Sequence, residues 1–323
     1  MKTTAGDLTS RLVGNIWNGY LRRVPYARKY KQLVESGGGK LVFDHLAFRT
    51  LNTRTGEQPS GITALSHFLK LLGYREAGTY KFKKQKITAV HYENEVVSLP
   101  RIFVSQLEVG EFPDWAVRLI QDVVHESPYV ISDMAIELMN CIAADGSINE
   151  EAAEILLEEL TGYFRRPWKM PPKDTMLRIN DVSQYAAWVL LHGNSVNHFA
   201  ASINDQNMPE WPDLESTCVA LAAAGIPMKD KIEGDKGSLL RQSATRSVVE
   251  NHRFPDLQGD FDEMEWTYAY LELTERGYTG QGDLRKLYSG FITGQAAHLF
   301  KMTQTRSNYV ISPSTLPGEF HSV

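Results

Sequence analysis

The sequence predicts an α+β fold in which two βαβββ modules share one curved sheet or half-barrel. Residues 41–107 show the order strand, helix, strand, strand, strand, and residues 194–274 show the same order again. The residues between these two stretches have mainly helical composition. A pattern that returns at this length indicates paired units that bury their apolar faces together. We therefore expect two modules that pack as a single domain, with N-terminal helices and a helical insert.

The composition is that of an ordinary globular chain. Of the 323 residues, 42% are hydrophobic and 23% are charged. The net charge of -5 and the pI near 6.0 argue against nucleic acid as the main partner. No stretch approaches the ~18 apolar residues that span a bilayer, and the opening MKTTAGDLTS lacks the apolar region of a signal peptide. Cys141 and Cys218 are too few for a disulfide framework, so we expect a cytoplasmic protein.

The first 110 residues divide into a helical segment, residues 1–40, and the first module, residues 41–110. Apolar residues at helical spacing predict helix over 7–35, and three glycines at 37–39 end it. A strand over 41–50 opens the module, followed by a helix over 61–72 that Gly73 stops. Residues 74–82, 87–93 and 101–107 predict three more strands.

Residues 111–192 predict the helical insert. Helical composition covers 113–164, and a further helix is predicted over 181–191 after a proline-rich stretch. The turn AADGSINEE lacks the ligand spacing of a calcium loop. We therefore interpret Gly146 as a helix stop, with a new N-cap at Ser147 or Asn149.

Residues 193–276 predict the second module. A strand over 194–203 and a helix over 213–224 are followed by strands near 229–234, over 238–250 and over 267–274. The last segment, residues 277–323, predicts a helix over 284–302 and an irregular tail.

The opening strand of the first module, LVFDHLAFRT, carries two polar side chains on an apolar face. Alternation places Phe43, His45, Ala47 and Arg49 on one face. Burying a guanidinium costs several kcal/mol unless an anion meets it. We therefore interpret His45 as a candidate metal ligand and Arg49 as a candidate anion contact.

Two further stretches supply partners for His45. NSVNHFAAS opens the second module and places His198 at the equivalent point, while YAYLELT closes that module with Glu272 on one face of a strand. Two histidines and one carboxylate from three strands make a facial triad, which leaves coordination positions open for substrate and oxygen on Fe(II). His91 and Glu93 share a face of another strand and form a rival metal pair. The remaining alternative is that each residue is simply a core or surface residue.

These stretches resemble a known group of proteins. The paired modules with DH, NH and YLELTER strands are similar to the vicinal oxygen chelate superfamily, which includes the glyoxalases and the extradiol dioxygenases. DHLAFRT, NSVNHFAAS, LLRQSAT and YAYLELTERG together resemble the DUF1338 family, the 2-oxoadipate dioxygenase/decarboxylases, from about residue 41 to residue 304. The fold that the resemblance implies is a vicinal-oxygen-chelate-type curved sheet.

The resemblance also implies a reaction and its residues. His45, His198 and Glu272 would be the iron ligands, and Arg49 the catalytic residue that binds the substrate carboxylate. Gln242 is implied as a substrate contact, and alternation puts Arg241 and Ser243 on the face opposite to it. The implied activity is Fe(II)-dependent decarboxylation and hydroxylation of a 2-oxo acid with O2, with 2-oxoadipate giving 2-hydroxyglutarate and CO2.

Two other functions stay open at this stage. A glyoxalase-like lyase or isomerase would use the same fold with Zn(II), Ni(II) or Mn(II), and would turn over without oxygen. A non-catalytic module would bind a partner through the helical insert. The sequence does not fix the substrate or the oligomeric state.

Overall fold

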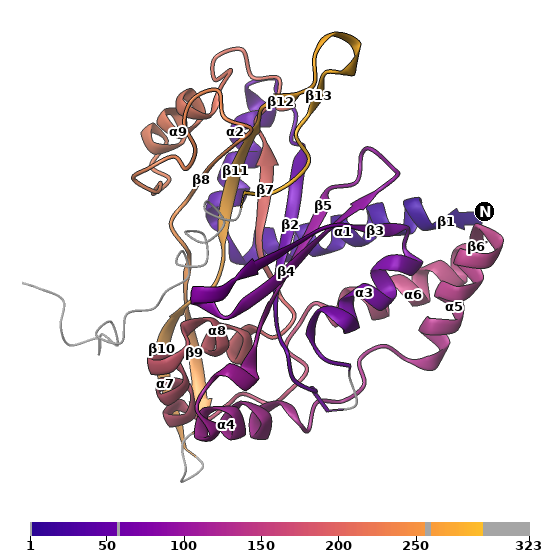
Figure 1. Ribbon diagram of the computed structural model, residues 1–323, viewed down its shortest axis with the longest axis vertical. Helices are drawn as coiled ribbons and strands as arrows, with labels where there is room; N and C mark the ends of the chain where they lie inside the picture. Colours follow the sequence, from indigo (N-terminus) through magenta and orange to yellow (C-terminus); the bar gives the residue numbers. More distant parts are fainter. Residues whose placement is uncertain (1, 57–58, 256–259, 293–323) are drawn as a thin grey trace, which may run out of the picture.

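The strands that carry the two predicted histidines lie side by side at the centre of one seven-stranded sheet (Figure 1). The computed structural model describes residues 2–56, 59–255 and 260–292. The strand order in the sheet is β3-β4-β5-β2-β7-β11-β8. In chain order these strands are β2 (Phe43–Leu51), β3 (Tyr74–Phe82), β4 (Ile87–Asn94), β5 (Arg101–Leu107), β7 (Val196–Ser202), β8 (Leu240–Ala244) and β11 (Tyr270–Arg276).

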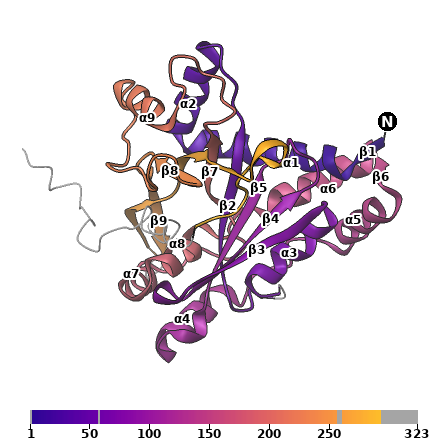
Figure 2. The same cartoon turned by 45° about the horizontal axis from the view of Figure 1, so that its top comes forward.

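The sheet joins the two modules through one antiparallel pair. β2 pairs antiparallel with β7, whereas β2 with β5 and β7 with β11 are parallel. Each parallel pair comes from one module, so the two halves are arranged alike about the β2–β7 junction. The sheet curls into a half-barrel (Figures 1 and 2), and the predicted α+β class is confirmed.

The first module has the predicted order. β2 leads through α3 (Gly61–Leu71) to β3, β4 and β5, with bounds close to those predicted. Most side chains of β2, β4 and β5 are buried, whereas most of those on β3, at the edge of the sheet, reach solvent. Gly73, at φ 85°, follows α3 and turns the chain into β3.

The second module contributes three strands to the sheet instead of four. β7 leads through α9 (Leu214–Ala223) to β8 and then β11. The strand predicted near 229–234 is wrong, because this segment forms isolated bridges, Met228 to Thr245 and Glu233 to Gln242. The segment is charged, and Gly234 and Gly237 adopt φ of 87° and 86°, conformations that interrupt a regular ladder.

The predicted strand over 238–250 is also divided. It contains β8 and the beginning of β9 (Val249–Pro255), which pairs with β10 (Phe261–Thr267) in a separate two-stranded sheet. The last predicted strand, over 267–274, begins at Tyr270. The sequence pattern did not predict this hairpin.

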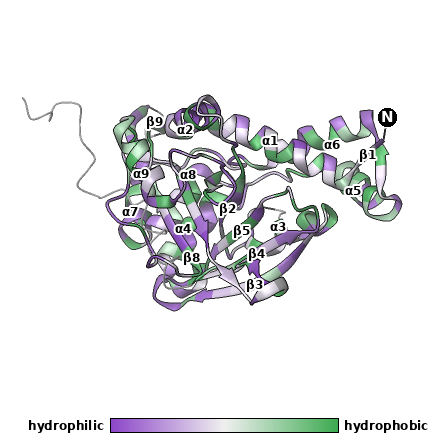
Figure 3. Ribbon diagram, turned by 90° about the horizontal axis from the view of Figure 1, so that it is seen from above, coloured by the Kyte–Doolittle hydropathy of each residue, from purple (hydrophilic) through white to green (hydrophobic). Residues whose placement is uncertain are grey.

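Helices cover the sheet. The N-terminal segment forms α1 (Ala5–Arg23) and α2 (Pro25–Ser36), and the insert forms α4 (Asp114–Val124), α5 (Asp133–Asp145), α6 (Glu150–Tyr163), α7 (Lys173–Val182) and α8 (Gln184–His192). α1 and α6 run side by side (Figure 3). Their outer ends are joined where β1 (Lys2–Thr4) pairs with β6 (Ser147–Asn149).

Helix-capping residues explain where the helices of the insert begin and end. Gly146 ends α5 at φ 75°, and the Asn149 side chain accepts a hydrogen bond from the Ala152 amide at the start of α6. The interpretation of AADGSINEE as a helix stop and restart is therefore confirmed. The helix predicted over 181–191 is confirmed as α8, which begins at Gln184 because Ser183 is extended and caps it. The preceding helix α7 was not predicted.

The C-terminal helix predicted over 284–302 is wrong where the structure describes the chain. Residues 282–284 form a 3-10 turn, and β13 (Lys286–Leu287) pairs with β12 (Tyr278–Thr279). Residues 293–302 of that prediction lie outside the described residues. Within the described ranges, no helix is both long enough and apolar enough to cross a membrane.

Candidate metal centre

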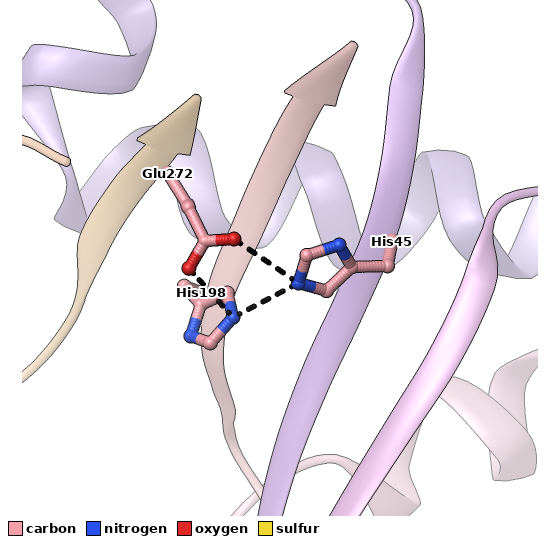
Figure 4. A group of neighbouring side chains, drawn as sticks. All are labelled: His45, His198 and Glu272. Carbon is pink, nitrogen blue, oxygen red and sulfur yellow. Dashed lines mark hydrogen bonds and ion pairs between the residues drawn. The ribbon is translucent and has the colours of Figure 1, made fainter. Parts of the chain in front are cut away.

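His45, His198 and Glu272 converge at one point of the sheet (Figure 4). They come from the neighbouring strands β2, β7 and β11. The two Nε2 atoms are 3.3 Å apart, His45 Nε2 is 3.4 Å from Glu272 Oε1, and His198 Nε2 is 3.5 Å from Glu272 Oε2. All three residues are buried, Glu272 completely. The three residues predicted as a metal triad are therefore brought together.

Two β-bulges orient the histidines. Along the β2–β7 ladder the register skips Asp44 on one strand and Asn197 on the other, the residue just before each histidine. An extra residue of this kind turns its side chain toward the same side as its neighbour's. The prediction that Phe43 shares a face with His45 is wrong, because the bulge at Asp44 lies between them. Phe43 instead packs on Trp17 and Phe199, with ring centroids 4.8 and 5.0 Å away.

Each bulge residue holds the histidine that follows it. His45 Nδ1–H donates to Asp44 Oδ1 at 2.8 Å, and His198 Nδ1–H donates to Asn197 Oδ1 at 3.1 Å. These bonds fix the tautomer of both rings and leave a lone pair on each Nε2, directed at the other ring and at Glu272. The sequence did not identify these acceptors, although both precede a predicted ligand directly.

Asp44 is itself held by a buried ion pair. Arg276 Nε and Nη2 donate to its two carboxylate oxygens at 2.5 and 2.8 Å. Burial alone would raise the pKa of Asp44, but the charge and hydrogen bonds of Arg276, with a smaller effect of His45, hold it far below its usual range. Asp44 is therefore a carboxylate at neutral pH.

The electrostatics of the triad fit a divalent cation. Burial raises the pKa of Glu272, and it lowers the pKa of His198, which the neighbouring His45 and Arg49 lower further. Glu272 Oε1 accepts hydrogen bonds from Gln242 and Thr274, whereas Oε2 is buried and accepts none from the described residues. Two imidazole lone pairs and one carboxylate, with ligand atoms that all lie within 4.8 Å of one another, form a donor set for a transition metal.

A small cavity of about 30 Å³ opens beside the triad. Arg49 lies in its wall, with its guanidinium over the rings of Tyr185 and Trp188 at 5.1 and 5.2 Å. Burial lowers the pKa of Arg49, but a guanidinium keeps its charge at any physiological pH. The predicted His and Arg of LVFDHLAFRT therefore do face one cavity.

Gln242 also lines this cavity and donates to Glu272. Arg241 points to the other side of β8, where it pairs with Glu215 and Glu275, so the predicted alternation is confirmed for this pair. Ser243 is buried, and its hydroxyl makes no hydrogen bond to any described group.

Tyr270 and Phe291 complete the wall. The Tyr270 ring stacks on His198 with ring centroids 4.8 Å apart, and its buried hydroxyl makes no hydrogen bond in the ranges that the structure describes. Phe291 packs edge-on against His45 at 4.9 Å and covers the cavity together with Phe103. No sequence pattern predicted a role for Phe291, which follows the last strand of the sheet.

The rival metal pair does not form a comparable centre. His91 Nε2 is 3.7 Å from Glu93 Oε1, and the same oxygen is 3.6 Å from Arg101 Nε. Burial is the main reason that the pKa of His91 falls to about 4. Within the described residues, no third ligand joins this pair.

The curled sheet and the buried triad at the junction of the modules define the chain as a glyoxalase-like protein of the vicinal oxygen chelate class. A putative glyoxalase superfamily protein from Ralstonia eutropha JMP134 superposes with a TM-score of 0.79 at 27% identity, covering 85% of each chain. The 2-oxoadipate dioxygenase/decarboxylase family model matches residues 22–314, and the chain belongs to that enzyme family.

The chain is similar to rice proteins both in sequence and in structure. The 2-oxoadipate dioxygenase/decarboxylase of Oryza sativa subsp. japonica is 28% identical, with 82% of this chain and 68% of that protein covered. The hydroxyglutarate synthase of Oryza sativa, solved in complex with 2-oxoadipate, has the same fold, with a TM-score of 0.73, 21% identity and 93% of each chain covered.

Proposed function

We propose that this chain is an Fe(II)-dependent enzyme that converts 2-oxoadipate and O2 into 2-hydroxyglutarate and CO2. The observation that carries the proposal is the convergence of His45, His198 and Glu272 beside Arg49, in a chain of the 2-oxoadipate dioxygenase/decarboxylase family. The reaction balances, because one oxygen atom of O2 enters the new carboxylate and the other enters the new hydroxyl group.

His45, His198 and Glu272 are the proposed metal ligands. Two neutral imidazoles and one carboxylate occupy one face of a metal ion, so positions remain for a chelating substrate and for oxygen. Bound Fe(II) would supply the redox chemistry that O2 activation requires. Asp44 and Asn197 keep both rings oriented, and Gln242 keeps Glu272 in place.

Arg49 is the proposed contact for a substrate carboxylate. It lies in the wall of the cavity beside both histidines, and burial strengthens its attraction for an anion. A guanidinium can meet a carboxylate with two parallel hydrogen bonds, which an ammonium cannot copy. The Tyr185 and Trp188 rings limit its movement and keep water away from it.

Tyr270 and Asn197 are the proposed neutral donors to the substrate. The Tyr270 hydroxyl and Asn197 Nδ2 are both buried and make no hydrogen bond within the described part of the chain, and both residues line the cavity. Buried polar groups in native proteins are nearly always satisfied. A carboxylate or keto oxygen of a 2-oxo acid would satisfy both, and Phe291 would exclude bulk water from the pair.

The test is oxygen uptake by the full chain after anaerobic loading with Fe(II). A panel of 2-oxo acids that includes 2-oxoadipate is supplied, and 2-hydroxyglutarate and CO2 are quantified. We expect one O2 consumed for each 2-hydroxyglutarate and each CO2 formed. His198→Ala should lose both iron binding and uptake, whereas His125→Ala, a histidine on the surface, should keep both.

The competing functions give different results in the same assay. Turnover without oxygen, with Zn(II), Ni(II) or Mn(II), would establish a glyoxalase-like lyase or isomerase. A chain that binds no stoichiometric metal would be a non-catalytic module. No oxygen uptake with any 2-oxo acid refutes the proposal. We also infer a reducing compartment such as the cytoplasm, since Cys141 and Cys218 are both free.

A further inference from the structure

A second, larger cavity of about 540 Å³ lies away from the metal centre, between α1 and the segment that follows α6. Its lining includes Arg22 and Arg23 at the end of α1 and Arg165 and Arg166 after α6. No aspartate or glutamate is among the described residues that line it. Four arginines thus line one cavity, in a chain whose net charge is -5.

Three of these arginines have no acidic partner among the described residues. Arg23 is neutralised by Glu250, through bonds of 2.7 and 2.6 Å, whereas Arg22, Arg165 and Arg166 form no ion pair with a described carboxylate. Glu154 and Glu158 lie near Arg165, but they line a neighbouring hollow over α6, and Glu154 already pairs with Arg11. The cavity therefore carries an excess of positive charge.

Arg166 is held in place by backbone groups. Its Nη1 donates to the Leu191 carbonyl at 2.7 Å, and its Nε donates to the Trp168 carbonyl at 3.1 Å. Burial and the nearby charge of Arg23 both lower its pKa. The fold thus keeps two like charges close together, an arrangement that an anion between them would stabilise.

A metal ion is a poor occupant for this end of the cavity. His192, Glu250 and His252 are close enough together to hold one. However, Arg23 takes both oxygens of Glu250 and lies 3.4 Å from His192 Nδ1, and the other ring nitrogen of His192 donates to the Thr267 carbonyl. A guanidinium already fills the place that a cation would take.

One polar atom in the wall has only a long ion-pair contact, and no hydrogen bond, among the described residues. His252 Nε2 is shut off from solvent and makes no hydrogen bond to any described group, and its distance to Glu250 Oε2 is 3.5 Å. His252 lines the cavity together with the arginines. A ligand oxygen that reaches this nitrogen would satisfy it.

We propose that this cavity is a binding site for a small anion that carries two or more negative charges. Its volume lies in the range of ordinary small-molecule sites. Arginines from two directions suit oxyanions, which accept paired hydrogen bonds from each guanidinium. Phosphate-type and polycarboxylate anions share this chemistry, and separate probes distinguish them.

The test is calorimetric titration of the full, metal-free chain with pyrophosphate and, separately, with citrate, at constant ionic strength. We expect saturable binding of one equivalent of at least one probe, and the tighter probe identifies the anion type. Arg22→Gln combined with Arg165→Gln should weaken that binding at least about tenfold. Both side chains are exposed, so the thermal unfolding temperature in chloride buffer should be unchanged.

The matched control is Arg28→Gln combined with Arg118→Gln. These arginines are also exposed and lie outside the cavity, so the control removes the same net charge. Its affinity should stay within about twofold of the wild type. Absence of saturable binding of both probes overturns the proposal, as does equal weakening by the two double variants.

Discussion

Replacing Asp44 by asparagine separates two roles of one carboxylate. Asp44 accepts the hydrogen bond of His45 Nδ1, and it neutralises Arg276. Asn197 shows that an amide oxygen is a sufficient acceptor, since it plays the first role for His198. Asp44→Asn should therefore keep His45 oriented while leaving the Arg276 guanidinium buried without its counter-ion.

The magnitude follows from the burial of the pair. The side chains of Arg276 and Asp44 are 2% and 3% exposed, so solvent cannot replace the lost partner. Breaking a buried ion pair on one side costs about 3–5 kcal/mol. At about 2 °C per kcal/mol for a chain of this size, the unfolding temperature of the metal-free protein should fall by roughly 6–10 °C.

Metal affinity should respond differently. Zn(II) titration should show a Kd for Asp44→Asn within about tenfold of the wild type, whereas Asp44→Ala, which also loses the acceptor, should weaken binding about 10- to 100-fold. Asn197→Ala is the control for the second module, since it loses an acceptor but no ion pair. Its affinity should fall similarly, with a stability loss near 1 kcal/mol.

Either of two results would contradict this reasoning. Unfolding of Asp44→Asn at the wild-type temperature would mean that the Asp44–Arg276 pair does not stabilise the fold. Equal losses of metal affinity in Asp44→Asn and Asp44→Ala would mean that the charge of Asp44, and not its acceptor oxygen, holds His45.

Tyr270, Phe291 and Glu250 each offer a test by single substitution. Tyr270→Phe keeps the ring on His198 but removes the buried hydroxyl, so the calorimetric Kd of 2-oxoadipate for the Zn(II) form should rise about tenfold. An unchanged Kd rejects the contact. Phe291→Ala uncovers the cavity, so stopped-flow association of 2-oxoadipate should be faster; an equal rate would show that Phe291 does not limit entry. Burial would raise the pKa of Glu250, but Arg23, with smaller effects of His252 and His192, lowers it to about 2 from 4.5. The Glu250–Arg23 pair therefore contributes at most about 3 kcal/mol to the free energy of unfolding above pH 4.5, and this contribution is lost as pH falls toward 2. In urea unfolding, the gap between wild type and Glu250→Gln should narrow with acid, and a pH-independent gap contradicts the assignment.

The central strands of the fold could be predicted from the sequence because strand alternation and the module repeat are patterns visible in the sequence itself. His45 and His198 lie at the same point of equivalent strands, and neighbouring strands in one sheet bring such points together. For Glu272 the strand pattern predicted only its face, and the pairing of β11 with β7 that brings it near His198 is a finding of the structure. Alternation alone also predicted that Gln242 and Arg241 lie on opposite faces of their strand.

The sequence-based predictions fail where one inserted residue, or a contact between residues far apart in the sequence, determines the structure. One extra residue in β2 moves Phe43 to the opposite face, and no propensity marks such a bulge. The ion pair of Asp44 with Arg276 joins residues 232 positions apart. Phe291 reaches the cavity from a segment with no regular pattern. Each of these depends on tertiary contacts that a sequence window does not contain.

The difference between Asp44 and Asn197 shows how two similar modules become unequal halves of one site. Arg276 lies on β11, four residues after Glu272, and can reach the bulge of β2 but has no counterpart at the bulge of β7 in the described structure. It also donates to the carbonyls of Tyr288 and Gly290, next to Phe291. One guanidinium therefore connects the acceptor that orients His45 to the segment that covers the cavity. Because the same side chain serves both, loss of Arg276 should disturb ligand orientation and cavity closure together.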